Sequence, residues 1–193
     1  MNIDLKDIIE EIGILIHERD VSGEKTPFII AVDGKSGGGK TTLASALFKK
    51  FGGVILHMDD FFLRPEQRTS ERLAEIGGNV DYERFLAVLE QAKSGEVIRY
   101  QPYDCKIRKL KEMQLILPEK LIIVEGSYSL HPYFGQYAGY KIGIDIGEEE
   151  QKKRILERNG SEMLPNFVNE WIPKENQYLK EFKIFEQCNV VIK

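Results

Sequence analysis

Residues 34 to 41 carry the pattern whose chemistry is most specific. Their sequence, GKSGGGKT, matches G-x-x-x-x-G-K-[ST], in which glycines let successive backbone N–H groups turn toward one anion. In this pattern Lys40 is expected to reach the β- and γ-phosphates of a nucleoside triphosphate, and the Thr41 hydroxyl to bind Mg²⁺. We therefore predict a P-loop that binds ATP through Gly34, Lys35, Ser36, Gly37, Gly38, Gly39, Lys40, Thr41 and Thr42.

A flexible glycine loop with an incidental lysine is the simpler interpretation of the same letters. The flanking sequence argues against it, because an apolar run over 28–32 precedes the loop and a helical pattern follows from Lys40. A helix that begins there adds the positive end of its dipole to the phosphate site. The loop is thus expected to join a buried strand to a helix.

Two further segments end in carboxylates. Asp59 and Asp60 follow the apolar run 54–58, and Glu125 ends another apolar run. Because ligands collect at the carboxyl ends of parallel strands, we expect these acids beside the P-loop, unless they form a solvated turn or a helix cap. Asp59 is the candidate base for a substrate hydroxyl, and Asp60 is a candidate substrate contact. Asp59 and Glu125, together with Thr41, are the candidate Mg²⁺ ligands.

Two arginines stand four residues apart in a later helical segment. Arg154 and Arg158 share one helix face, since residues at this spacing are neighbours on a helix. Enzymes that transfer phosphoryl groups use arginines to clamp phosphates and to neutralise charge in the transition state. Pairing with Glu150 on a solvated face is the alternative. We predict that both arginines act in catalysis from a lid.

These groups need a sheet whose strand ends meet. Apolar runs predict strands over 28–32, 54–58, 121–125, 141–146 and 188–192. Helical periodicity predicts helices over 3–18, 40–50, 82–95, 148–160 and 161–187, the last interrupted near Pro173, with Trp171 in the core. A β-hairpin flap is predicted over about 96–116, a polar mobile flap over 64–80 and a lid over about 150–162. We expect a single α/β domain over 1–193, a three-layer sandwich whose five-stranded, mostly parallel sheet is flanked by helices.

The bulk composition narrows the function classes. The chain has 193 residues, 27 basic and 31 acidic, for a net charge of −4, which makes nucleic acid an unlikely main partner. Its two cysteines, Cys105 and Cys188, fit no metal or redox spacing, as expected for free thiols in a reducing compartment. We find no signal peptide and no apolar run of 18 residues, so we expect a cytoplasmic protein without a membrane partner. Self-association stays open.

Six motifs, in this order along the chain, resemble the uridine kinase-like branch of P-loop kinases, which have the P-loop NTPase fold. They are DGKSGGGKTTLA, HMDDFF, NVDYERF, QPYDC, VEGSYSL and RILERNG. The resemblance implies that Asp59 is the catalytic base, that Phe62 lies beside the substrate and that Asp81 binds ribose hydroxyls. It also implies that Tyr103 lies along the base, that Glu125 sits near the metal, and that Arg154 and Arg158 approximate the lid arginines.

Some of these positions carry an alternative or depart from the pattern. Asp81 could equally be the N-cap of the helix that follows it. Cys105 stands where uridine kinases usually have an aromatic residue, and Arg108 stands where a histidine helps to read the pyrimidine. Both departures fall in the expected base pocket, where Arg108 could favour a more anionic or more polar acceptor.

The sequence therefore predicts a kinase that uses ATP and Mg²⁺ to phosphorylate a hydroxyl of a small molecule, with a nucleoside such as uridine or cytidine as the favoured acceptor. A sugar phosphate or a vitamin precursor is the alternative acceptor. From another class, a nucleotide-dependent switch protein remains open, although the two flaps look suited to enclosing a small molecule.

Overall fold

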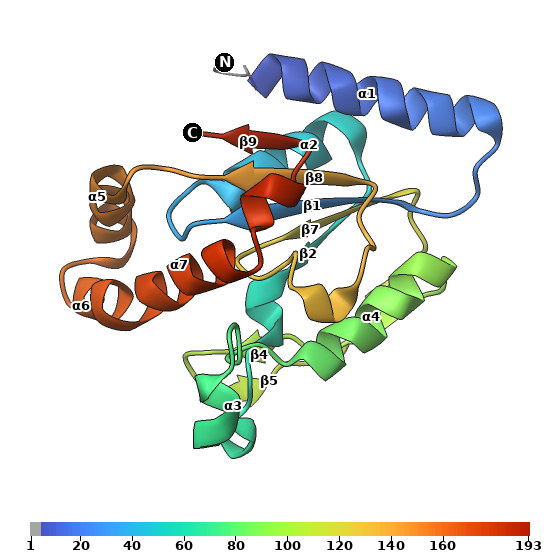
Figure 1. Ribbon diagram of the computed structural model, residues 1–193. Helices are drawn as coiled ribbons and strands as arrows, with labels where there is room; N and C mark the ends of the chain where they lie inside the picture. The colour runs from blue at the N-terminus through green and yellow to red at the C-terminus, as the bar shows by residue number, and fades with distance from the viewer. Residues whose placement is uncertain (1–4) are drawn as a thin grey trace.

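Five parallel strands form the centre of the molecule. The computed structural model describes residues 5–193, and Figure 1 shows its sheet between two layers of helices. The strand order is β2-β7-β1-β8-β9, and every neighbouring pair runs parallel. The bounds are Phe28–Gly34 for β1, Val54–His57 for β2, Leu121–Glu125 for β7, Tyr140–Ile144 for β8 and Val190–Ile192 for β9. The predicted α/β fold with five strands is confirmed, and the sheet is entirely parallel.

Alternate residues of the strands pack against different helices, which makes three layers. On β1, Ile30 and Val32 join one apolar cluster with α1 (Leu5–Ser22) and α2 (Lys40–Phe51). Ile29 and Ala31 join the opposite cluster with α4 (Tyr82–Ser94) and α7 (Ile172–Glu181). Because both faces are covered, the strands are continuous apolar runs rather than alternating ones. None of the helices in residues 5–193 is long and apolar enough to cross a lipid bilayer.

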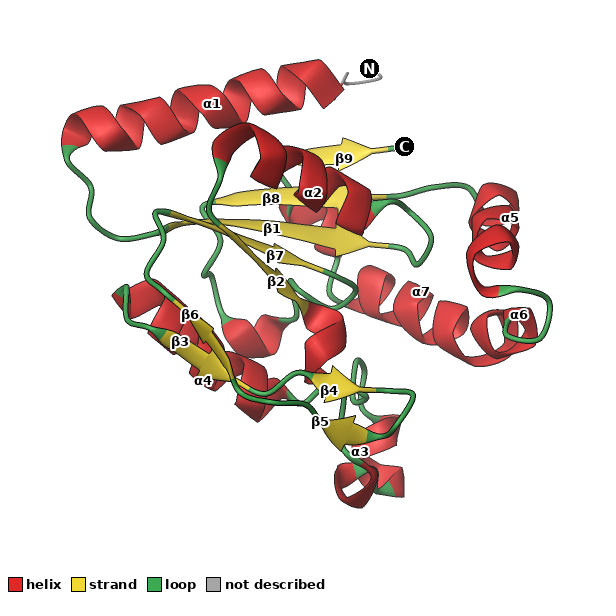
Figure 2. Ribbon diagram, turned by 180° about the vertical axis from the view of Figure 1, so that it is seen from behind, coloured by secondary structure: helices red, strands yellow, loops and turns green. Residues whose placement is uncertain are grey.

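The predicted hairpin is present, but it is divided into two short ladders. In one ladder β3 (Ile98–Tyr100) pairs with β6 (Gln114–Ile116), and in the other β4 (Tyr103–Asp104) pairs with β5 (Lys109–Leu110). Both pairs are antiparallel, and the break falls at Gln101 and Pro102, where proline removes a ladder donor. In Figure 2 the ladder of β4 and β5 lies beside α3 (Ser70–Ala74) at the edge of the molecule.

The flap over 64–80 is more ordered than its polar sequence suggests. It contains a 3-10 turn, Pro65–Gln67, and the short helix α3. Its carboxyl end is packed: Val80 is buried and bridges to Phe62, and the Arg72 guanidinium lies over the Tyr82 ring at 4.1 Å. The expectation of a segment wholly outside the core is therefore wrong at this end, because single apolar residues anchor an otherwise polar loop.

The carboxyl-terminal helices carry the predicted interruption. After α5 (Glu148–Asn159) and α6 (Leu164–Asn166), a π-helical turn over Phe167–Trp171 leads into α7, whose first residues include Pro173. Trp171 was expected in the core, but it is half-exposed and belongs to a small separate cluster around Phe167, with the ring centroids 4.4 Å apart. Further 3-10 turns cover Met58–Phe61, Pro132–Phe134 and Ile184–Gln187.

Candidate active site

The strand register brings three chain segments to one edge of the sheet. Glu125, the last residue of β7, lies opposite Val32 on β1 and opposite His57 on β2. The P-loop starts two residues after Val32, and Asp59 follows two residues after His57. Since β7 separates β1 from β2, its terminal carboxylate stands between the P-loop and Asp59. The predicted donor-side groups therefore meet at the carboxyl ends of the strands.

The backbone of the P-loop can only be built with glycine at its first position. Gly34 has φ of 132°, and a Cβ there would lie 2.2 Å from the Ile144 carbonyl oxygen on β8. Gly37 and Gly39 also have positive φ, of 73° and 100°. Glycine adopts these values without steric cost, which lets the loop curl around the amino end of α2. All nine residues predicted to bind the nucleotide lie on this turn or on the first helical residues after it.

Lys40 is folded back onto the loop in this structure. It is buried, and its Nζ donates hydrogen bonds to the carbonyl oxygens of Gly34 at 2.8 Å and Lys35 at 3.0 Å. A third bond, of 3.2 Å, goes to Ser127 Oγ in the loop after β7. These three acceptors use all three N–H groups of the ammonium, so a phosphate oxygen that bound Lys40 would replace one of them.

A hydroxyl and a carboxylate suited to magnesium face each other beside the loop. Thr41 Oγ1 lies 3.2 and 3.3 Å from the two carboxylate oxygens of Glu125. No group of three or more His, Cys, Asp or Glu side chains arranged for a metal occurs in residues 5–193. Magnesium in phosphoryl-transfer sites needs only one or two carboxylates, because phosphate oxygens and waters complete its shell. The Thr41 and Glu125 oxygens therefore fit Mg²⁺ bound together with a nucleotide.

His57 is a site residue that the sequence reasoning missed. Its Nδ1 lies 2.5 Å from Glu125 Oε1, and this hydrogen bond raises the pKa of His57, while desolvation of the ring opposes the shift. The register of β2 against β7 produces the pair directly. Because Glu125 accepts from both His57 and Thr41, its carboxylate is oriented from two sides. The position of His57 two residues before the acidic pair, in HMDD, was the only sequence signal for it.

The two aspartates after β2 have different surroundings. Asp59 is exposed, and its side chain has no hydrogen bond within the described part of the chain. Desolvation by the surrounding protein and the Glu125 carboxylate raise the pKa of Asp59, whereas Lys40 and Arg158 lower it. Asp60 accepts a 3.0 Å hydrogen bond from the Tyr100 hydroxyl of the hairpin. Asp59 is thus the carboxylate without a hydrogen-bond partner in residues 5–193, and Asp60 links the loop after β2 to the hairpin.

The lid arginines contact different parts of the site. Arg154 pairs with Glu150, Nε to Oε1 at 2.7 Å, and its Nη1 lies 3.3 Å from the carbonyl oxygen of Gly38 in the P-loop. The ion pair of Arg154 with Glu150, which was the alternative to a lid role, is therefore present, but the same arginine also contacts the P-loop. Arg158 donates to Asn159 and lies 6.0 Å from the Phe167 ring centre, while its charge favours ionised Asp59.

The residues predicted to contact the acceptor are only partly gathered around Asp59. Phe62 is half-buried, and Asp81 is almost fully buried as the N-cap of α4, where it accepts from the Arg84 backbone N–H at 3.2 Å. Tyr103 is 5% exposed. Arg108 stands exposed with φ of 55° in the turn between β4 and β5, and it makes no hydrogen bond or ion pair in residues 5–193.

Arg84 connects three segments on the acceptor side and was not predicted. Its guanidinium donates to the carbonyl oxygens of Gln101 at 2.6 Å and Asp60 at 2.8 Å, and it pairs with the Asp81 carboxylate at 3.3 Å. The same group lies 4.9 Å from the Phe61 ring centre. Hairpin, β2 loop and α4 are therefore fixed to one another through a single side chain.

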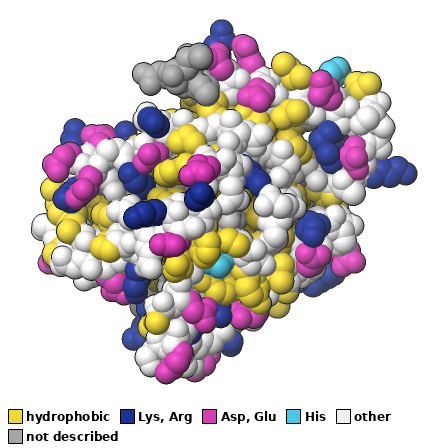
Figure 3. All heavy atoms as spheres, viewed as in Figure 1, with side chains coloured by type: hydrophobic (Ala, Val, Ile, Leu, Met, Phe, Trp, Pro, Cys, Tyr) yellow, Lys and Arg dark blue, Asp and Glu magenta, His cyan; other side chains and the backbone are white. Residues whose placement is uncertain are grey.

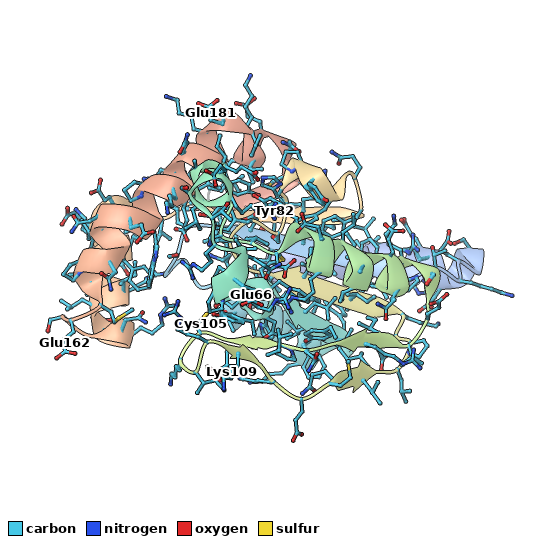
Figure 4. All side chains as sticks on the ribbon, turned by 90° about the horizontal axis from the view of Figure 1, so that it is seen from below. Glu66, Tyr82, Cys105, Lys109, Glu162 and Glu181 are labelled. Carbon is cyan, nitrogen blue, oxygen red and sulfur yellow. The ribbon has the colours of Figure 1, made fainter. Side chains whose placement is uncertain are left out.

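The surface around the cleft carries mixed charge. Figure 3 shows acidic and basic side chains interspersed over the face seen in Figure 1, without a continuous basic stripe. Figure 4, seen from below, shows Cys105 on the hairpin turn and Glu66 on the neighbouring flap near the centre of the view. Burial raises the pKa of the Cys105 thiol, and the Asp59 carboxylate adds to this shift, whereas Arg68 of that flap opposes it.

Comparison with known proteins finds relatives among uridine kinases and uridine kinase-like proteins. No protein-family model matches the chain. Uridine kinase-like protein 5 of Arabidopsis thaliana is 27% identical over 157 residues, covering 75% of this chain but 33% of that protein. A uridine kinase of Clostridium perfringens is 23% identical over 177 residues, covering 83% of this chain and 85% of that protein. The chain thus spans about a third of the plant relative and most of the bacterial one.

Two solved structures share the whole fold. A candidate uridine kinase from Bacillus stearothermophilus superimposes with a TM-score of 0.71 at 18% identity, covering 99% of this chain and 100% of that chain. A candidate fructose transport system kinase from Silicibacter superimposes with a TM-score of 0.74 at 17% identity, covering 98% of both chains.

Fold and site have the arrangement of a P-loop small-molecule kinase. The sequence relatives to which the chain is similar are named uridine kinases or uridine kinase-like proteins.

Proposed function

We propose that the protein transfers the γ-phosphoryl group of ATP, with Mg²⁺, to a hydroxyl of a nucleoside such as uridine or cytidine. One observation carries this proposal: Glu125 stands within 3.3 Å of the Thr41 hydroxyl, on the strand between the P-loop and Asp59. The proposal is supported by this arrangement, in which a phosphate-binding loop, a candidate metal pair and a free carboxylate follow strand ends at the same edge of the sheet.

The roles of the donor-side residues follow from their positions. Lys40 and the loop N–H groups bind and orient the triphosphate, and Arg154 lies beside Gly38 to neutralise charge on the transferred group. Thr41 and Glu125 would hold Mg²⁺, which supplies charge neutralisation on the phosphate oxygens. Asp59 accepts the proton of the acceptor hydroxyl, because its carboxylate is exposed and unpaired within residues 5–193. Catalysis is then mainly positioning and electrostatics.

The nucleoside is proposed from the relatives named uridine kinase and from the residues of the acceptor side. Phe62 is half-buried at the cleft, next to the loop that carries Asp59. Asp60, Asp81, Tyr103 and Arg108 are the remaining proposed acceptor contacts. Of these, Asp60 is fixed to the hairpin through Tyr100, and this bond would keep the hairpin close to the acceptor.

The surroundings of Asp81 and Tyr103 favour an acceptor other than a nucleoside. The Asp81 carboxylate already accepts from Gln67, at 3.1 Å, and from Arg84, and Tyr103 is nearly inaccessible. Side chains occupied in this way have little capacity left for ribose hydroxyls or for a base. A smaller polar acceptor, such as a sugar or sugar phosphate, is therefore the competing proposal.

A coupled assay of ADP release separates these proposals. The purified chain is incubated with ATP and Mg²⁺ and with uridine, cytidine, purine nucleosides, sugars and sugar phosphates in turn. Acceleration by a pyrimidine nucleoside supports the first proposal, and acceleration by a sugar or sugar phosphate alone supports the second. Slow hydrolysis that no small molecule accelerates contradicts both and favours a switch protein. Lys40→Ala is the negative control, because loss of the P-loop lysine should weaken ATP binding or turnover. Unchanged kinetics in that variant would contradict the P-loop assignment itself.

A further inference from the structure

A carboxylate from α7 is inserted against the P-loop. Glu175 is 5% exposed, and its Oε2 accepts a 3.0 Å hydrogen bond from the Ser36 backbone N–H. Its Oε1 accepts from the hydroxyl of Ser36 and, at 2.8 Å, from the hydroxyl of Ser127. Three donors thus converge on one buried acid that the proposed mechanism does not use.

These donors belong to the phosphate-binding machinery. The Ser36 N–H is one of the backbone groups of the loop that bind anions. Ser127 Oγ accepts from Lys40 Nζ at 3.2 Å, so one hydroxyl separates the Glu175 carboxylate from the lysine that would bind the β- and γ-phosphates. The carboxylate therefore lies against the amino-terminal part of the loop, one hydroxyl away from Lys40.

The helix that carries Glu175 is held in place. Three residues further along α7, the Tyr178 hydroxyl donates a 2.6 Å hydrogen bond to Asp33, the buried residue directly before the P-loop. Residues three apart lie on the same helix face, so both side chains of α7 point to the loop. This second contact holds the part of α7 that carries Glu175 against the start of the P-loop.

We propose that Glu175 is an internal anion that competes with the terminal phosphate, and that it sets how strongly the site discriminates ATP from ADP. The proposal rests on the proposed function, that is, on a nucleoside triphosphate bound at this loop. A γ-phosphate brought to Lys40 meets a like charge at short range, which opposes its binding. ADP ends one phosphate earlier and meets less of this repulsion. The site is thereby weakened specifically for the nucleotide that has a γ-phosphate.

The test compares the dissociation constants of Mg·ATP and Mg·ADP by isothermal titration calorimetry on the full chain. Glu175→Gln keeps the shape and the acceptor oxygen of the side chain but removes its charge. We expect it to tighten ATP binding on the order of tenfold and to change ADP binding by no more than about twofold. Glu181→Gln is the matched control, because Glu181 is an exposed acid on the same helix (Figure 4). It should change neither constant.

A purely structural role gives another result. If Glu175 only fastened α7 to the loop, Glu175→Gln would lower the melting temperature and weaken both nucleotides equally, and the proposal would be overturned. Should that variant not fold, Glu175→Ala, which also removes the charge, must shift the ATP-to-ADP ratio in the same direction. An unchanged ratio in the folded variants overturns this inference alone, whereas a wild-type chain that binds neither nucleotide overturns the proposed function as well.

Discussion

The Tyr178 hydroxyl donates a 2.6 Å hydrogen bond to the fully buried carboxylate of Asp33, joining the last long helix to the end of the central strand. The same carboxylate accepts from the backbone N–H groups of Gly34, Tyr128 and Leu130. Asp33 therefore ties the P-loop, the loop after β7 and α7 together at one point.

Removing the tyrosine hydroxyl should destabilise the fold. Tyr178→Phe leaves a buried carboxylate without one of its donors, which costs roughly 1–3 kcal/mol of unfolding free energy. Urea denaturation followed by circular dichroism measures the loss. Tyr133→Phe is the control, because the Tyr133 ring is half-exposed and its hydroxyl has no partner among residues 5–193. Equal stability of the two variants would contradict the role given to the Asp33 bond.

The same variant should show a pH dependence of defined sign. Burial raises the pKa of Asp33, and the hydrogen bond from Tyr178 lowers it, so Tyr178→Phe raises it further. An acid whose folded pKa exceeds its unfolded value loses stability as pH rises from the unfolded pKa, 3.8, through the folded one. The gap between wild type and Tyr178→Phe should therefore widen from pH 4 upward in urea titrations. A constant gap would show that Asp33 does not ionise in the folded state.

Asp59→Asn should separate binding from chemistry. Loss of a general base lowers kcat by about 10²- to 10⁴-fold, while nucleotide affinity should stay nearly unchanged because the phosphates bind at the loop and not at Asp59. Steady-state kinetics with the best acceptor and calorimetry with ATP provide the two measurements. Asp20→Asn serves as the control, because Asp20 is an exposed acid that pairs with Lys120 at the amino end of β7, whereas Asp59 lies at the carboxyl ends of the strands. Full turnover of the Asp59 variant would refute its assignment as the base.

Arg84→Lys should affect the acceptor and spare the nucleotide. A lysine cannot reproduce the contacts of the guanidinium to Gln101, Asp60 and Asp81 at once, so the hairpin and the β2 loop lose their common anchor. We expect a rise in the acceptor KM on the order of tenfold with the ATP KM unchanged. Arg99→Lys, on the exposed side of β3, should change neither. Parallel changes in both constants would indicate general destabilisation instead.

A polar group in the lid offers a stabilising substitution. Gln151 on α5 is buried, and its Nε2 has no hydrogen-bond partner in the part of the chain that the structure describes. Gln151→Leu removes this unsatisfied amide at nearly constant volume and should raise the unfolding free energy by about 1 kcal/mol. Gln151→Ala should lower it, because it also leaves a cavity. A loss of stability in the leucine variant would mean that the amide is satisfied in solution.

The donor side of the site could be predicted because its information is local. Glycines, Lys40 and Thr41 form one contiguous motif, and Glu125 ends a strand whose placement follows from the rules of parallel sheets. The strands of the sheet follow from the same apolar runs, and their ends differ from the predicted ones by a residue or two. The hairpin was also predictable, since its two halves are close in sequence.

The remaining contacts depend on residues distant in sequence. Glu175 reaches Ser36 across 139 positions, and Tyr178 reaches Asp33 across 145. Neither has a local signal, because each lies on an ordinary amphipathic helix. Tyr103 illustrates the same difficulty on the acceptor side: a short run of alternating residues does not indicate which face of a small hairpin is covered.

The central position of β7 has a consequence for how the protein is made. β7 pairs with both β1 and β2, and it is translated after both of them and after the whole hairpin. A nascent chain that already contains the P-loop and Asp59 therefore still lacks the strand that lies between them. The edges of β1 and β2 that pair with β7 stay unpaired until residues 121–125 have left the ribosome. Closure of such long-range parallel pairs is intrinsically slow, so the P-loop and Asp59 come together only once β7 is in place, and β8 and β9 are added to the sheet after that.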